Sequence, residues 1–154
     1  MPRTALIVVV PEAQSAVADG SAAPGVPAHI TILFPFAGAG GVDEAAVAEL
    51  LSSFPAFAFS LDRIERFDDG LVWLRPEPSE PFSALTHAIW RRFPDYPPYE
   101  GVHDVVIPHL TLGLNVDVDI ELPIHTVARD VTLLEEGPTG RWSVRRVFPL
   151  QGVA

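Results

Sequence analysis

The sequence has 154 residues and contains neither cysteine nor lysine. Without cysteine the chain can form no disulfide and no thiolate zinc site, and it has no cysteine nucleophile. All ten cationic side chains are arginine, so a Walker-type phosphate-binding lysine and a Schiff-base lysine are also excluded. The chemistry that remains is that of histidine, hydroxyl and carboxylate groups.

Long apolar runs are missing as well. The first run, ALIVVV at residues 5–10, stops at Pro11 and is too short for a membrane span or for the apolar core of a signal peptide. With 48% apolar residues the chain can still bury a substantial core. We therefore expect one cytoplasmic, monomeric domain over residues 1–154, without contact to a membrane.

Positive charge is scarce, since the formal net charge is −10. A protein that holds long nucleic acid needs an extended basic face, because neutralisation of phosphates dominates its affinity. Long DNA is therefore disfavoured as a partner, whereas a small phosphorylated ligand is not. Two arginine pairs, Arg91-Arg92 and Arg145-Arg146, can each hold a phosphate or belong to a solvated face.

The chain contains a motif that occurs twice. HITILF at residues 29–34 and HLTLGL at residues 109–114 each combine a histidine and a threonine with apolar residues. Each motif also lies just after a proline, Pro27 or Pro108. The two copies are about half a chain length apart, which predicts two similar halves, each with a small sheet, related by an approximate two-fold axis.

Local signals predict the elements around the motifs. Apolar residues at helical spacing after an acidic start predict a helix over residues 43–54. Ser79 can cap a second helix, and Asp69-Gly70 between two apolar runs is typical of a hairpin. Residues 115–126 show little helical periodicity, so a helix there is expected to be short or absent. The expected strands cover residues 4–10, 29–34, 57–67, 71–78, 109–114, 129–136 and 141–150.

Alternation along a strand separates the side chains of each motif into two faces. His29 and Thr31 share one face, as do His109 and Thr111. The other face carries only apolar residues, for which we predict packing in the core: Ile30, Ile32 and Phe34 in the first motif and Leu110, Leu112 and Leu114 in the second. With two-fold symmetry the polar faces can meet in one cleft.

Two imidazoles are suited to phosphodiester hydrolysis without a metal. One, neutral, takes a proton from the attacking water, and the other, protonated, gives a proton to the departing sugar oxygen. Histidine can fill both roles because its ordinary pKa of about 6.5 is close to working pH. The threonine hydroxyls can donate hydrogen bonds to the phosphate oxygens.

The paired motifs resemble those of the 2H phosphoesterase superfamily, also called the 2′-5′ RNA ligase-like family, and residues 71–113 are similar to it in their spacing and in their Pro-Pro-Tyr loop. The resemblance implies an α+β fold of two pseudo-symmetric lobes, each a small, largely antiparallel sheet with outer helices, around a central cleft. It also implies cofactor-free and metal-independent cleavage of a 2′,3′-cyclic phosphate or similar phosphodiester of RNA ends or small nucleotides. Carried over by motif, the catalytic positions are His29, Thr31, His109 and Thr111.

Other interpretations remain open at this stage. The same family similarity allows 2′-5′ RNA ligation, and the same cleft can bind a phosphorylated nucleotide without turnover. A two-histidine metal site would need ligands from outside the motifs, since neither contains a carboxylate. Tyr99 and His103 lie on the loop before the second motif and are candidates for substrate binding, Tyr99 by stacking on a base. Trp73 and Trp142 are expected in the core or in the cleft wall.

Overall fold

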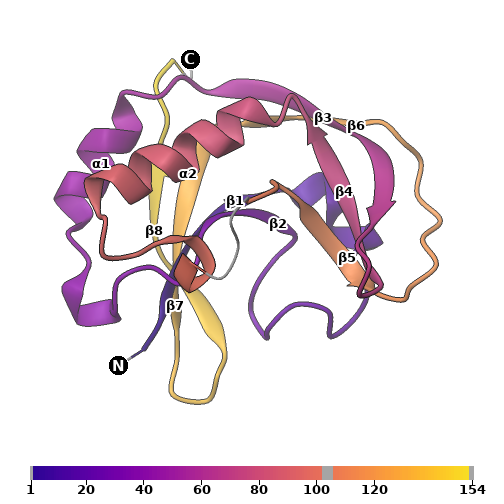
Figure 1. The fold of residues 1–154 in the computed structure, drawn as a ribbon, viewed down its shortest axis with the longest axis horizontal. Coiled ribbons are helices and arrows are strands. Elements are labelled where there is room, and N and C mark those ends of the chain that lie inside the picture. Colours follow the sequence, from indigo (N-terminus) through magenta and orange to yellow (C-terminus); the bar gives the residue numbers. More distant parts are fainter. Residues whose placement is uncertain (1, 102–105, 153–154) are drawn as a thin grey trace.

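The computed structural model describes residues 2–101 and 106–152, which form one curled antiparallel sheet with few helices (Figure 1). The sheet has eight strands in the order β6-β3-β4-β5-β2-β1-β7-β8. The strands are β1 (Thr4–Val9), β2 (His29–Leu33), β3 (Phe57–Arg66), β4 (Leu71–Glu77), β5 (Leu110–Leu114), β6 (Ile124–Ala128), β7 (Asp130–Glu136) and β8 (Trp142–Pro149). Strand β6 was not predicted, and no helix lies between β5 and β6.

Two α-helices, α1 (Glu44–Ser52) and α2 (Glu80–Arg92), lie on one side of the sheet (Figure 1). Asp43 caps α1 by accepting a hydrogen bond from the backbone N–H of Ala46. Ser79 occupies the N-cap position of α2 as predicted, but its side chain makes no capping hydrogen bond. Short 3-10 helices cover Pro11–Ala16 (η1), Ala39–Gly41 (η2) and Pro98–Gly101 (η3). Within the ranges described, no helix is long and apolar enough to cross a membrane.

The main core lies between the helices and the sheet. Its members are buried apolar side chains from α1, α2 and the strands, and they include Val47, Leu51, Phe82, Leu85, Ile89, Leu6, Val8, Ile30, Ile32, Val72, Leu74, Leu110 and Leu112. A second, smaller cluster of Ala5, Ile7, Leu134 and Trp142 lies apart from it. Because Ile7 pairs with Thr31, this smaller cluster shares its face of the sheet with the threonine.

The two small sheets predicted for the halves are joined in the structure into one. The junction is the antiparallel contact of β2 with β5, where Ile30 pairs with Leu110, and four strands lie on each side of it. The prediction of separate sheets failed because the alternation within a strand does not say which edges pair. The junction therefore places the two motifs side by side in one sheet.

A bulge follows the threonine in both motifs. Leu6 and Ile7 of β1 pair with Leu33 and Thr31, so Ile32 is the extra residue in β2. Val72 and Trp73 of β4 pair in the same way with Gly113 and Thr111, so Leu112 is the extra residue in β5. A bulge of this kind reverses the alternation beyond it.

Because of this reversal, the predicted faces are wrong at the ends of both motifs. Leu33 rather than Phe34 packs in the main core, and Phe34 turns to the opposite side, where it contacts Trp142 with ring centroids 5.9 Å apart. Leu114 is 59% exposed instead of buried. Phe34 thereby joins the face that carries His29.

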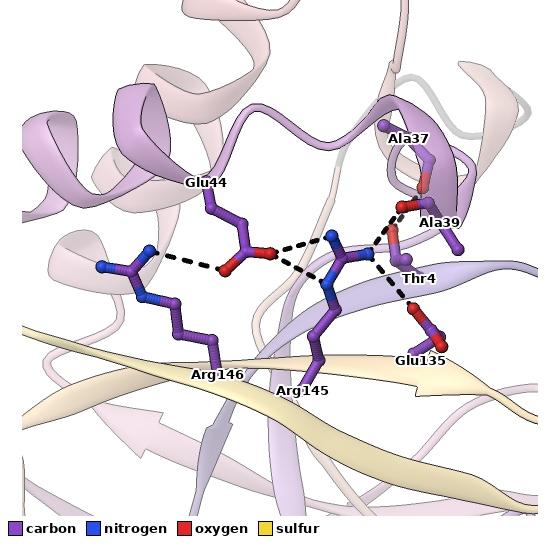
Figure 2. A network of polar contacts seen from close by, with 7 residues as sticks. All are labelled: Thr4, Ala37, Ala39, Glu44, Glu135, Arg145 and Arg146. Atoms are coloured by element: carbon purple, nitrogen blue, oxygen red, sulfur yellow. Dashed lines mark hydrogen bonds and ion pairs between the residues drawn. The ribbon is translucent and has the colours of Figure 1, made fainter.

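Arg145 belongs to a polar network next to the start of α1 (Figure 2). Its guanidinium donates to Glu44, to Glu135 and to the carbonyl of Ala39, at 3.0, 3.1 and 2.6 Å. Arg146 makes an ion pair with Glu44 at 3.4 Å. These contacts connect β8 with α1 and β7. Both arginines of the pair therefore have carboxylate partners within the fold.

Candidate active site

The residues of both motifs lie near the β2–β5 junction, where His29, Thr31 and Thr111 line one cavity and His109 lines another. Ile30 pairs with Leu110 across the antiparallel junction, and its neighbours therefore pair in reverse order. His29 lies opposite Thr111, and Thr31 lies opposite His109, which immediately precedes β5. Each histidine thus has a threonine on its own strand and another across the junction.

Both imidazoles are oriented by the same backbone contact. Nδ1 of His29 donates to the carbonyl of Pro27 at 2.8 Å, and Nδ1 of His109 donates to the carbonyl of Ile107 at 2.7 Å. A carbonyl oxygen can only accept, so the proton is on Nδ1 in each neutral ring. In both histidines Nε2 is therefore the nitrogen suited to exchange a proton with a ligand.

His29 lines a cavity of about 400 Å³. Burial lowers the pKa of His29 below its usual value of 6.5, the hydrogen bond to Pro27 opposes this, and charge on His109 lowers it further. The neutral form of His29 is therefore favoured at neutral pH. The cavity is mostly apolar and also contains both threonines; its other lining residues include Arg3, Ala5, Ile7, Val26, Pro27, Phe34, Leu134 and Trp142.

His109 lines a second cavity, of about 350 Å³. The imidazole lies edge-on to the rings of Phe67 and Trp73, with centroids 5.6 and 5.9 Å away, and these two rings stack on each other. Asp69 and Tyr99 line the same cavity. The two histidines are thus near enough to influence each other but have different surroundings.

Tyr99 lines the same cavity as His109. Burial raises the pKa of the Tyr99 phenol, and the hydroxyl of Thr31 lowers it in part. The stacking of Tyr99 on a base, which the sequence suggested, stays a prediction. His103, the other predicted binding residue, lies outside the described residues.

The sequence did not predict that Arg3 lies next to Phe34 and Trp142 in the wall of the first cavity. The Arg3 guanidinium lies 5.4 Å from the ring centroid of Phe34 and 5.8 Å from that of Trp142, and it makes an ion pair with Glu136 at 2.8 Å. Trp142 was expected in the core or the cleft wall. No local pattern joins these residues, because the pairing of β1, β7 and β8 assembles them.

No cluster of three or more metal-ligating side chains is present in residues 2–101 and 106–152. The two motifs contribute imidazole and hydroxyl groups, and hydroxyls are weak ligands for zinc and other transition metals. Among the described residues, the groups that the motifs bring together are therefore better suited to proton transfer and hydrogen bonding.

Solved structures with the same fold are phosphoesterases and related proteins. LigT of E. coli in its apo form is 18% identical, with a TM-score of 0.66 over 98% of this chain and 99% of its own. LigT complexed with 3′-AMP gives 17% identity and a TM-score of 0.66 over the same shares. TT0787 of Thermus thermophilus is 18% identical, with a TM-score of 0.66 over 99% of this chain and 100% of its own. The curled antiparallel sheet is therefore that of the LigT-like proteins.

The family follows from the sequence as a whole. The model of the 2′-5′ RNA ligase superfamily matches residues 3–151, almost the entire chain. The protein belongs to this superfamily, the 2H phosphoesterases, as the doubled motif suggested. No match is found among the curated proteins.

Proposed function

We propose that the protein hydrolyses a 2′,3′-cyclic phosphate, or a similar phosphodiester of an RNA end or small nucleotide, by general acid–base catalysis with His29 and His109. The observation that carries the proposal is the junction of β2 and β5, which brings both histidines and both threonines together on one face. Both imidazoles are held through Nδ1, so each can use Nε2 for proton transfer.

The different surroundings of the histidines assign their roles. His29, whose lowered pKa favours the neutral ring, takes a proton from the water that attacks phosphorus. The bond between phosphorus and one ribose oxygen breaks, and protonated His109 gives its proton to that oxygen. The product is a nucleoside monophosphate, and exchange of one proton from His29 to solvent and one back to His109 restores the starting state.

The threonines hold the phosphate between the two histidines. Thr31 and Thr111 face each other diagonally across the junction, so their hydroxyls can donate to the two non-bridging oxygens. Such hydrogen bonds strengthen as negative charge develops in the transition state, which is the condition for catalysis rather than binding.

The cavity beside His29 is suited to the nucleoside. It is mostly apolar, and the aromatic side chains of Phe34 and Trp142 contribute to its wall. Rings of this kind support a nucleobase by stacking without requiring extra positive charge. That LigT has been solved with 3′-AMP supports a ligand of this class.

The test is product analysis. The purified protein is incubated with each of the four 2′,3′-cyclic nucleoside monophosphates in the presence of EDTA, and the products are separated as 2′- and 3′-monophosphates. We expect turnover to a single isomer, because one ribose oxygen lies at the acid. Activity that vanishes in EDTA and returns with a divalent ion would refute the metal-independent mechanism, and absence of turnover on every cyclic and linear phosphodiester would refute hydrolysis.

A further inference from the structure

Arg3 is the one arginine among the described residues that line the two cavities beside the motifs. It lies on the same face as Ala5 and Ile7, and Ile7 pairs with Thr31. Along the strand direction Arg3 is therefore about 13 Å from the level of Thr31, at about 3.3 Å per residue. A nucleotide has a similar length from its phosphate to the far edge of its base, hydrogen bonds at both ends included. A ligand whose phosphate lies at Thr31 can thus present its base edge to Arg3.

The guanidinium of Arg3 is held in one orientation. Nε and Nη2 donate to the two carboxylate oxygens of Glu136 at 2.9 and 2.8 Å, a bidentate arrangement that fixes the plane of the group. The guanidinium also lies over the rings of Phe34 and Trp142. Because these contacts already order the side chain, Arg3 loses little further freedom when it binds a ligand.

Arg3 retains hydrogen-bond donors after this pairing. Within the described part of the chain, the side-chain hydrogen bonds of Arg3 are those of Nε and Nη2 with Glu136, and Nη1 makes none. The side chain is 55% exposed, so a ligand in the cavity can reach it. A guanidinium carries only donors and no acceptor, and it therefore recognises acceptor atoms.

Glu136 decides which kind of acceptor is suited to this position. Its carboxylate lies 2.8 Å from the guanidinium and neutralises it. A second phosphate on the ligand would be attracted by Arg3 but repelled by Glu136, and the two effects largely cancel. An uncharged carbonyl oxygen meets no such repulsion. The arginine–glutamate pair therefore favours the edge of a neutral base over a further phosphate.

We propose that Arg3 is a specificity-determining residue, which donates to a carbonyl oxygen on the base edge and so favours guanine and uracil over adenine and cytosine. The inference rests on the proposed function. Guanine presents two acceptors, O6 and N7, on the edge in question, and uracil presents O4. Adenine and cytosine carry an amino group in place of that oxygen, and an amino group would point a donor at the donors of Arg3.

The first test compares kcat/KM for the four 2′,3′-cyclic nucleoside monophosphates. In the parent we expect guanosine over adenosine and uridine over cytidine, each by about tenfold, the lower part of the range for base discrimination because Arg3 is partly exposed. Arg3→Met keeps most of the apolar stem and removes the donors. Both ratios should fall below about twofold, through loss with the guanosine and uridine substrates.

Two further variants control for charge and for folding. Arg141→Met removes the same charge from the β7–β8 connection, outside the lining of the cavity, and should leave both ratios unchanged. Arg3→Lys keeps the charge and can keep the ion pair with Glu136, but it lacks the second arm of the guanidinium. Its ratios should also fall, so the test remains decisive even if Arg3→Met does not fold.

Three results would overturn the inference. The first is a parent that does not distinguish the bases within each pair. The second is ratios that persist in the folded Arg3 variants, and the third is an equal decrease in Arg141→Met, which would show an effect of net charge. Any of these, obtained with an active parent, leaves the proposed hydrolysis intact.

A binding measurement separates this inference from the proposed function. If the parent cleaves no phosphodiester, the proposed function fails, and the four nucleoside 3′-monophosphates are titrated by calorimetry instead. Arg3 should then favour 3′-GMP over 3′-AMP and 3′-UMP over 3′-CMP, and Arg3→Met should remove both preferences. Equal affinities in the parent, or no binding of any of the four, would overturn the inference.

Discussion

The two halves of the site use one backbone device in two different settings. In each half a histidine donates through Nδ1 to the carbonyl two residues before it, and a bulge follows the neighbouring threonine. The surroundings differ, because His29 lies in an apolar cavity whereas His109 lies beside Phe67, Trp73 and Asp69. The comparison teaches that the repeat determines where the imidazoles lie, while the side chains around each imidazole determine how readily it takes up a second proton.

Removing either imidazole should have the largest effect. His29→Ala and His109→Ala should each lower turnover of a 2′,3′-cyclic nucleotide by about 10² to 10⁴, the usual worth of a positioned acid or base. The double variant should lose much less than the product of the two factors, because the pair acts as a unit. Steady-state kinetics of the three variants, with circular dichroism as the control for folding, makes the comparison.

One outcome would count against a mechanism in which His29 and His109 act together. If His29→Ala remains folded and retains the parent's turnover on every phosphodiester that the parent cleaves, the first motif is a structural repeat only. The proposed pairing of roles would then be wrong.

The threonines should matter less than the histidines. Thr31→Val and Thr111→Val retain the branched side chain and remove one phosphate donor each, so each should reduce kcat/KM by about 10- to 100-fold, the worth of a hydrogen bond to a charged group. Steady-state kinetics of both variants measures these factors, and an unchanged kcat/KM in both would mean that neither hydroxyl donates to the phosphate.

A change far from both histidines separates fold from function. Glu44→Gln weakens the ion pairs with Arg145 and Arg146 and should lower the free energy of unfolding by about 1 kcal/mol, as expected for a partly exposed network. Turnover below the unfolding temperature should be unchanged. Urea denaturation and kinetics of the same preparation test both statements, and a raised KM would show instead that the arginine pair contributes to the ligand site.

The smallest effect is on stability as a function of pH. Because the pKa of His29 is lower in the folded protein than the usual 6.5, the unfolded chain binds more protons between these two values. The free energy of unfolding should therefore fall as pH decreases below about 7, and His29→Asn should reduce that slope. Urea titrations of both proteins at several pH values measure it; an unchanged slope in the variant would show that His29 is not desolvated.

The sequence predicted most of the local structure around the motifs. Helical spacing identified α1 and α2, and turn signals identified the hairpins β3–β4 and β7–β8, because these features depend on nearby residues. The side-chain alternation also placed His29 and Thr31 on one face, and both line the first cavity. These predictions succeeded where a periodic pattern reports directly on the face that is buried.

The failures share a different physical cause. The bulge at Ile32 is invisible in the alternation of apolar residues, so Phe34 was assigned to the wrong face. The joining of two sheets and the contact of Arg3 with Trp142 depend on strand pairing between distant segments. The position of Tyr99 in the cavity of His109 depends on two left-handed residues, Tyr99 and Glu100, that no glycine marks. Long-range pairing and local strain therefore escaped prediction.

The pH dependence of kcat/KM tests the central claim most directly, since that claim is one neutral and one protonated imidazole in the same site. With a 2′,3′-cyclic nucleotide and EDTA present, we expect a bell-shaped profile whose limbs belong to the histidine pair. The acidic limb should fall below pH 6.5, because burial lowers the pKa of His29. A rate that rises steadily through the range in which histidines titrate would mean attack by hydroxide without a general acid, and would contradict the account.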